Sequence, residues 1–158
     1  MAALPASVWR NPVHFAAFGF GSGAVPVAPG TFGTVMGGVI YLCLPPMGIW
    51  GYGCFVLISF LAGIWLCGKT ARDIGVHDHG GIVWDEFVGF WITLFMVPPG
   101  LLWLLGGFCL FRVFDILKPW PIRWLDAHVE GGLGVMIDDV LAGLMALACL
   151  QVLAFFIL

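Results

Sequence analysis

Five carboxylates in this sequence have the type and spacing to carry out chemistry. Asp85 and Glu86 are adjacent, Asp115 follows, and Asp138 and Asp139 form a second adjacent pair. Most of the residues around them are apolar. An ionised carboxylate is costly at membrane depth, so it is normally paired, bound to a metal or placed in a polar cavity. We therefore expect the function of the chain to depend on these acids.

Carboxylates that several helices bring to one depth suit a hard divalent cation. Ligand sets made only of oxygen, without cysteine, favour Mg²⁺ over zinc. The alternative is a set of salt bridges, and Arg112 and Asp115 have the i, i+3 spacing of a helical ion pair. The chain has nine acidic residues against six Lys and Arg residues. This surplus of negative charge favours a bound cation.

A second candidate site is the glycine-rich segment 19–34. Glycines such as Gly23 leave backbone N–H groups free to point inward, and a glycine-rich turn before a helix can bind an anion. Ser22, Thr31 and Thr34 could add hydroxyl donors. No Gly-Lys-Ser/Thr follows, so the segment is not a Walker A loop. A packed re-entrant turn is the alternative.

Basic residues form a third element, which comprises Lys69, Arg72, Lys118 and Arg123. They could hold a phosphate or lipid headgroups, or they could mark membrane topology only. The segment 77–79 adds a candidate for proton transfer, with a solvated loop as the alternative. Acids for a metal, an anion loop and cationic side chains together resemble the parts needed for phosphoryl transfer.

The composition indicates an integral membrane protein. Charged residues make up 9% of the 158 residues, against about 25% in a soluble domain, and the mean hydropathy is +1.06. We expect one all-α domain over residues 1–158, with no basic run for nucleic acid and with cysteines that act as small apolar residues. The N-terminal region lacks the apolar core of a signal peptide.

The apolar stretches predict a polytopic helical bundle of about five spans. The expected helices cover 33–50, 51–68, about 81–97, 101–117 and a last helix that ends in the run 140–158. A helix needs about 20 residues to cross a bilayer, and the uncharged part that follows Glu86 is shorter than that. The third helix must therefore include Asp85 and Glu86 in its first turns. The last helix is expected to begin with Asp138 and Asp139 near its start.

Five spans with the N-terminus inside place every Lys and Arg on one side of the membrane. The opposite turns, 45–51 and 97–101, contain neither residue type. The positive-inside rule makes the charged face cytoplasmic. The acids fall on the same face, so we expect the site to face the cytoplasm, where an anionic lipid is a plausible substrate.

Four motifs in order resemble the bacterial phosphatidylglycerophosphatase A family, over about residues 11–150. They are GFGSG at 19–23 with APGT at 28–31, VHDHG at 76–80 with IVWDEFVG at 82–89, FRVFDILKPWPIRW at 111–124, and GGLGVMIDDV at 131–140. The resemblance implies a Mg²⁺-dependent phosphatase of the bacterial inner membrane. Such an enzyme removes the terminal phosphate of phosphatidylglycerophosphate, which leaves phosphatidylglycerol.

The sequence lacks the signatures of several other phosphatase classes. It has no Cys-x5-Arg loop, no Asp-x-Asp-x-Thr motif, and no Lys/Arg/His signature of lipid phosphatases with a histidine nucleophile. These absences favour a water molecule activated by the metal. An aspartyl-phosphate on Asp78 or Asp85 is the alternative.

We hypothesise that the candidate residues divide into three roles. The ligands of one or two Mg²⁺ ions are Asp85, Glu86, Asp138 and Asp139, with Asp115 as a further ligand or base. The phosphate-binding residues are Ser22, Gly23, Thr31, Lys69, Arg72 and Lys118. Proton transfer is assigned to Asp78 or His79.

Two other functions stay open from the sequence. A small ion or proton transporter would also contain intramembrane acids, but here the acids are confined to one face. A non-catalytic assembly subunit would leave the surplus of acids unexplained. The oligomeric state is not predicted.

Overall fold

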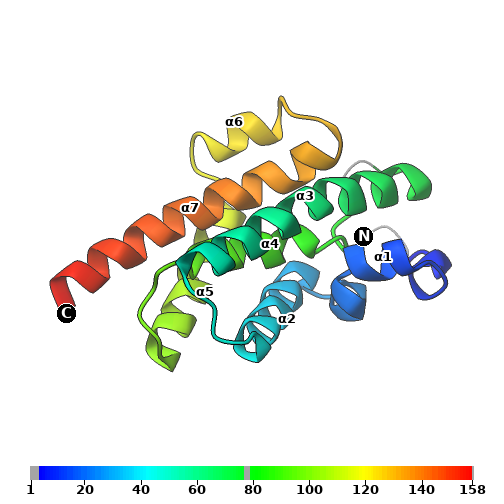
Figure 1. Ribbon diagram of the computed structural model, residues 1–158. Helices are drawn as coiled ribbons and strands as arrows, with labels where there is room; N and C mark the ends of the chain where they lie inside the picture. Colours follow the sequence, from blue (N-terminus) through cyan, green and yellow to red (C-terminus); the bar gives the residue numbers. More distant parts are fainter. Residues whose placement is uncertain (1–3, 77–78, 158) are drawn as a thin grey trace.

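The computed structural model describes residues 4–76 and 79–157, which form helices and no strand (Figure 1). The expected all-α class is therefore confirmed for the described part of the chain. His77 and Asp78 lie outside the described residues. The elements in chain order are η1 (Ala6–Trp9), α1 (Pro12–Ala17), η2 (Gly19–Ala24), α2 (Pro29–Cys43), α3 (Ile49–Ile74), α4 (Trp84–Thr93), α5 (Leu101–Leu117), α6 (Ile122–Asp126) and α7 (Gly131–Ile157).

Two long helices, α3 and α7, lie side by side and run in opposite directions (Figure 1). Within the described residues, only these two are long and apolar enough to cross a membrane, with 26 and 27 residues. The prediction of five spans is not confirmed, because α2, α4 and α5 contain 15, 10 and 17 residues. A perpendicular helix needs about 20 residues to cross the hydrocarbon core.

The ends of the first two predicted helices differ from those in the structure, and prolines account for the ends of the first. The first predicted helix, 33–50, is α2, which begins at Pro29 and ends at Cys43 before Pro45 and Pro46. Proline suits the first turn of a helix but interrupts its interior. The second predicted helix, 51–68, is the longer α3, which extends far enough to include Lys69 and Arg72.

The last helix begins earlier than its sequence indicates. It starts at Gly131, two turns before Asp138, so Gly132 and Gly134 are helical residues rather than a preceding turn. A Cβ at Gly132 would lie 1.9 Å from the carbonyl oxygen of Ile64 in α3. The glycines therefore allow α7 to approach α3 closely at its start.

Helix α4 lies at the centre of the molecule and contacts α2, α3, α5 and α7. Its Phe87, Val88, Phe90 and Trp91 side chains are buried. The Trp91 indole Nε1 donates to the Gly37 carbonyl oxygen of α2 at 2.9 Å. This burial and the hydrogen bond fix the helix that begins with Asp85 and Glu86.

Glycines also bring the backbones of α4 and α7 into direct contact. A Cβ at Gly143 would lie 2.3 Å from the Gly89 carbonyl oxygen, and a Cβ at Gly89 would lie 2.6 Å from the Asp139 carbonyl oxygen. The Thr93 hydroxyl of α4 also donates to the Gly143 carbonyl oxygen of α7 at 3.4 Å. The first turns of α4 are therefore held beside Asp139.

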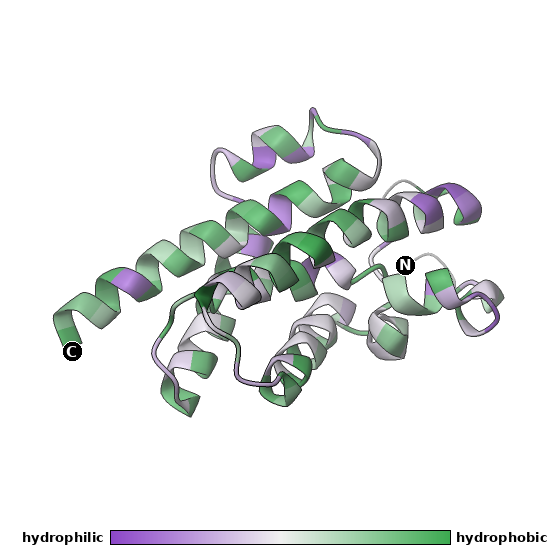
Figure 2. Cartoon of the chain, viewed as in Figure 1, coloured by the Kyte–Doolittle hydropathy of each residue, from purple (hydrophilic) through white to green (hydrophobic). Residues whose placement is uncertain are grey.

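Hydrophobic residues cover most of α3 and α7, whereas hydrophilic residues gather at the C-terminal end of α3 and around α6 (Figure 2). The last turns of α3 contain Lys69, Arg72 and Asp73. The charged residues of these elements therefore lie toward one end of the long helices.

Candidate active site

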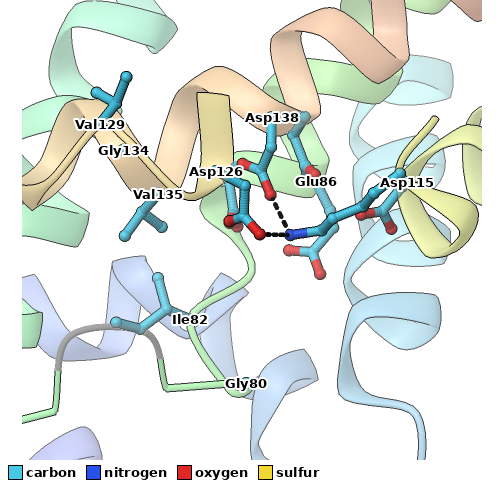
Figure 3. A pocket seen from close by; sticks show the side chains of 12 residues that line it. Gly80, Ile82, Glu86, Asp115, Asp126, Val129, Gly134, Val135 and Asp138 are labelled. Carbon is cyan, nitrogen blue, oxygen red and sulfur yellow. Dashed lines mark hydrogen bonds and ion pairs between the residues drawn. The ribbon is translucent and has the colours of Figure 1, made fainter. Parts of the chain in front are cut away.

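A polar pocket of about 170 Å³ lies where the start of α4, the end of α5, α6 and the first half of α7 meet. All five acids singled out from the sequence line it, and Figure 3 labels Glu86, Asp115 and Asp138 among them. The pocket is lined by Gly80, Ile82, Asp85, Glu86, Asp115, Lys118, Asp126, Val129, Gly134, Val135, Asp138 and Asp139. Segments that are far apart in the sequence thus bring six carboxylates to one cavity.

Three of these carboxylates form a cluster suited to one metal ion. Asp85, Glu86 and Asp139 each offer an oxygen, and these oxygens lie within 4.8 Å of one another. Asp139 is only 3% exposed. The first turn of α4 supplies two of these carboxylates and α7 supplies the third, at the place where the Gly89 and Gly143 contact holds the two helices together.

Several carboxylate oxygens in the pocket have no hydrogen-bond donor in the described part of the chain. They are Glu86 Oε2, Asp138 Oδ1 and Asp139 Oδ2, and all three are buried. A buried anionic oxygen without a partner is costly, so such groups are normally paired, protonated or bound to a cation. Because Mg²⁺ binds carboxylate oxygens and retains several waters, the residues present fit this ion.

Arg112 also approaches this pocket, although only its possible ion pair with Asp115 was foreseen. Its Nη1 pairs with the Asp115 carboxylate and lies 4.0 Å from Glu86 Oε1, and its side chain is 14% exposed. The salt-bridge alternative therefore holds for Asp115. The i, i+3 spacing was the signal in the sequence, but the proximity of Glu86 depends on how α4 and α5 pack.

The start of α2 borders the same acids. A Cβ at Gly30 would lie 2.3 Å from Glu86 Oε1 and 3.1 Å from Arg112 Nη1. Only a residue without a side chain lets α2 come this close. Gly30 thus lies against the acids of the pocket, and it is the residue through which the predicted glycine-rich segment borders the site.

Lys118 joins α5 to the α6 and α7 side of the pocket. Its Nζ lies 2.7 Å from Asp138 Oδ2 and 3.2 Å from Asp126 Oδ2. Burial opposes the charged form, but the hydrogen bonds and charges of Asp138 and Asp126 outweigh it and raise the pKa of Lys118 above its ordinary value. Lys118 is therefore an ammonium at neutral pH. Asp126 was not among the predicted site residues, and its polar surroundings were the only signal for it.

The other predicted phosphate-binding residues lie outside the lining of this pocket. The Ser22 hydroxyl donates to the Gly19 carbonyl oxygen at 2.8 Å, and a Cβ at Gly23 would lie 2.1 Å from the Gly81 carbonyl oxygen. Thr31 lies in the first turn of α2, and its N–H donates to the Ala28 carbonyl oxygen at 3.0 Å. Segment 19–24 thus packs against the residues that lead into α4.

Lys69 and Arg72 occupy the end of α3, and neither lines the pocket. Lys69 Nζ lies 2.7 Å from Asp73 Oδ2. The same carboxylate oxygen lies 3.0 Å from His14 Nε2, and His14 Nδ1 contacts the Ser7 hydroxyl at 2.9 Å. This network connects the N-terminal segment to α3. Arg72 is exposed.

His79 is 8% exposed and precedes the pocket residue Gly80. Its Nδ1 accepts a hydrogen bond from the Gly81 N–H at 3.1 Å, so in the neutral ring Nε2 carries the proton. Nε2 is buried without a partner in the described residues. Asp78, the other residue assigned to proton transfer, lies outside the described residues.

Comparisons with known proteins converge on one family. The sequence model described as phosphatidylglycerophosphatase A matches residues 15–154. The phosphatidylglycerophosphatase A of Escherichia coli is 47% identical over 137 residues, which cover 86% of this chain and 80% of the relative. That of Haemophilus influenzae is 53% identical over 140 residues, which cover 86% and 85%.

A protein from Bacteroides thetaiotaomicron provisionally named a phosphatidylinositol-3-phosphatase is 40% identical over 142 residues, which cover 85% of this chain and 88% of the relative. No solved structure matches the chain. The family match includes every acid that lines the pocket. The chain belongs to the phosphatidylglycerophosphatase A family of phosphatases.

Proposed function

We propose that this chain hydrolyses the terminal phosphomonoester of phosphatidylglycerophosphate, which yields phosphatidylglycerol and phosphate, with Mg²⁺ as its cofactor. The observation that carries the proposal is the pocket of six carboxylates, in which buried oxygens of Glu86, Asp138 and Asp139 have no donor in the described residues. Family membership names the reaction, and this pocket supplies residues that could perform it.

Asp85, Glu86 and Asp139 would hold the ion, because their oxygens converge within 4.8 Å. When bound, Mg²⁺ would screen the charge of the phosphate and lower the pKa of a water molecule that attacks phosphorus. Asp138, which was expected to be a fourth ligand, pairs with Lys118 through one of its oxygens. Its second oxygen remains available to the pocket.

The cationic side chains of the pocket would bind the phosphate oxygens. Lys118 Nζ carries three protons, and its two carboxylate partners leave one for a substrate oxygen. Arg112 holds Asp115 in a fixed position beside Glu86. Asp115 would accept the proton of the attacking water, as the base that the sequence predicted.

The leaving alkoxide needs a proton, and His79 is our candidate for the donor. In the described structure the Gly81 N–H donates to Nδ1, so the neutral ring carries its proton on Nε2. To act as the acid, the ring would release this hydrogen bond and take up a second proton at Nδ1, so that donation from Nε2 leaves a neutral imidazole. His79 is adjacent to Gly80, which lines the pocket. Asp78 is the alternative donor. A positioned acid of this kind contributes typically about 10²- to 10⁴-fold to a reaction rate.

We further propose that the chain spans the bacterial inner membrane several times and that the pocket faces the cytoplasm. Two apolar helices support membrane insertion. All six Lys and Arg residues fall outside the turns 45–51 and 97–101, which supports the orientation. The acyl chains would then stay in the bilayer while the headgroup enters the pocket.

The proposal is tested by phosphate release from phosphatidylglycerophosphate by the purified chain in detergent, with Mg²⁺ and after chelation. We expect release that requires Mg²⁺. Phosphatidylinositol 3-phosphate and glycerol 3-phosphate serve as parallel substrates, because one relative is named for the former and the latter lacks acyl chains. No release, or release that chelation leaves unchanged, would contradict the proposal and favour a transporter or an assembly subunit.

A further inference from the structure

Lys118 occupies a backbone position that normally favours glycine. It ends α5 with φ 43° and ψ 60°, in the left-handed region, and its N–H donates to the Phe114 carbonyl oxygen at 2.9 Å. Glycine is preferred at this position because it has no Cβ to clash with the backbone. A lysine here indicates that the side chain has a role that outweighs the backbone strain.

Two of the six acids of the pocket pair with Lys118, three others form the candidate metal cluster, and Asp115 pairs with Arg112. The cluster of converging oxygens comprises Asp85, Glu86 and Asp139. Asp126 and Asp138 both contact Lys118 Nζ, at 3.2 Å and 2.7 Å (Figure 3). The ammonium therefore occupies a point that two carboxylates share, which is also the arrangement that binds a divalent cation.

We propose that the Lys118 ammonium takes the place of a second divalent cation, so that the pocket binds a single metal ion at Asp85, Glu86 and Asp139. This inference rests on the metal site of the proposed function and adds its stoichiometry. Sites with two metal ions use the second ion to stabilise charge on the attacking or leaving oxygen. Here a fixed ammonium supplies that positive charge without a second ion.

The solvent exposure of Asp126 and Asp138 indicates whether a cation could reach them if Lys118 were removed. The Asp138 side chain is 12% exposed, whereas that of Asp126 is 41% exposed. Without the ammonium, two carboxylates would face each other at a place that solvent ions can reach. Because Mg²⁺ and Mn²⁺ need only one or two carboxylates with waters, the lysine-free pocket would gain a second cation site.

The test is the number of Mn²⁺ ions bound per chain, measured by equilibrium dialysis of the purified detergent-solubilised protein and by the electron paramagnetic resonance signal of free Mn²⁺. We expect one ion for the unchanged chain and two for Lys118→Met. Lys118→Arg, which keeps the charge, and Lys69→Met, which removes a lysine outside the pocket lining, should each bind one. The double variant Lys118→Met with Asp126→Asn should return to one ion.

Each other outcome identifies which claim fails. Two ions in the unchanged chain would overturn the inference and leave the proposed metal site intact. No bound ion would overturn the proposed metal site, and the inference with it. One ion in a Lys118→Met variant that keeps its helical circular dichroism would also overturn the inference. Because the count in the unchanged chain is decisive without any variant, the test does not depend on how the variants fold.

Discussion

At the scale of single residues, the pocket concentrates negative charge where water is largely excluded. Asp139 is 3% exposed, and the Glu86 side chain is 12% exposed. Arg112 and Lys118 compensate part of this charge. Like charges held this close would destabilise the folded chain, and the proposed cation would relieve their repulsion.

Asp139→Asn should therefore separate metal binding from folding. The amide keeps the shape of the carboxylate but removes one of the crowded charges. In chelator we expect the variant to be at least as resistant to thermal unfolding as the unchanged chain. Added Mn²⁺ should stabilise only the unchanged chain, by about 2.7 kcal/mol at an ion concentration of 100 times its Kd. Thermal unfolding in detergent measures both effects, and equal stabilisation of the two proteins would count against Asp139 as a ligand.

Gly30→Ala should lower turnover through Glu86. The new methyl group would lie 2.3 Å from Glu86 Oε1, so the carboxylate must move out of the metal cluster. A displacement of about 1 Å at a catalytic group can reduce the rate by about 100-fold. The matched control is Gly53→Ala in α3, whose Cβ would lie 3.8 Å from Phe95. Steady-state phosphate release should fall for the first variant and not for the second, and equal rates would exclude Gly30 from the site.

The sequence predicted which acids meet, but it did not predict how their surroundings are arranged. Asp85 and Glu86 lie in the first turn of α4, and α5 covers Leu101–Leu117, as the apolar stretches indicated. The roles of Asp126 and Arg112 depend on contacts between distant elements, which local periodicity does not encode. For the glycine-rich segment 19–34 the sequence left two interpretations, an anion-binding loop and a packed re-entrant turn. The close approach of Gly23 to the Gly81 carbonyl oxygen agrees with the packed turn at that position.

At the scale of elements, the contact between α4 and α7 positions the three carboxylates that we propose as metal ligands. Gly89 and Gly143 let the two backbones touch, and the Gly89 position also approaches the Asp139 carbonyl oxygen. The three oxygens of the cluster come from these two helices. The spacing of the helices should therefore control both stability and metal affinity.

Gly143→Ala should weaken the protein and its metal binding together. Its methyl group would lie 2.3 Å from the Gly89 carbonyl oxygen, which is backbone and cannot rotate away. Overpacking of this kind costs about 1–3 kcal/mol. Gly106→Ala in α5 is the matched control, because its Cβ would lie 3.8 Å from Leu150. Thermal unfolding and Mn²⁺ titration of the two variants provide the measurement, and a Gly143→Ala protein with unchanged affinity would refute this role of the helix contact.

At the scale of the whole molecule, the charged residues lie toward one end of the long helices. The turn before α3 contains Gly48, whereas the last turns of α3 contain Arg72. If α3 spans the membrane, these two residues lie on opposite sides, with Arg72 in the cytoplasm.

Labelling of single cysteines should reveal this orientation. In a chain whose five native cysteines are replaced, Gly48→Cys should react with a membrane-impermeant maleimide on intact cells. Arg72→Cys should react only after the cells are permeabilised. Both sites are exposed, and a Cβ at Gly48 meets no atom within 4 Å. Labelling of Arg72→Cys on intact cells would reverse the proposed orientation.

We propose that the carboxylate pocket between α4 and α7 performs a metal-dependent dephosphorylation of a lipid. The most direct measurement is phosphate release from phosphatidylglycerophosphate by the unchanged chain and by Asp139→Asn, at saturating Mg²⁺ and in chelator. Loss of a residue that only supports a metal ligand costs about 10- to 100-fold, so loss of a ligand should cost at least about 100-fold. We predict Mg²⁺-dependent release by the unchanged chain and release by the variant close to that in chelator. Near-normal, Mg²⁺-dependent release by a folded Asp139→Asn variant would contradict the claim.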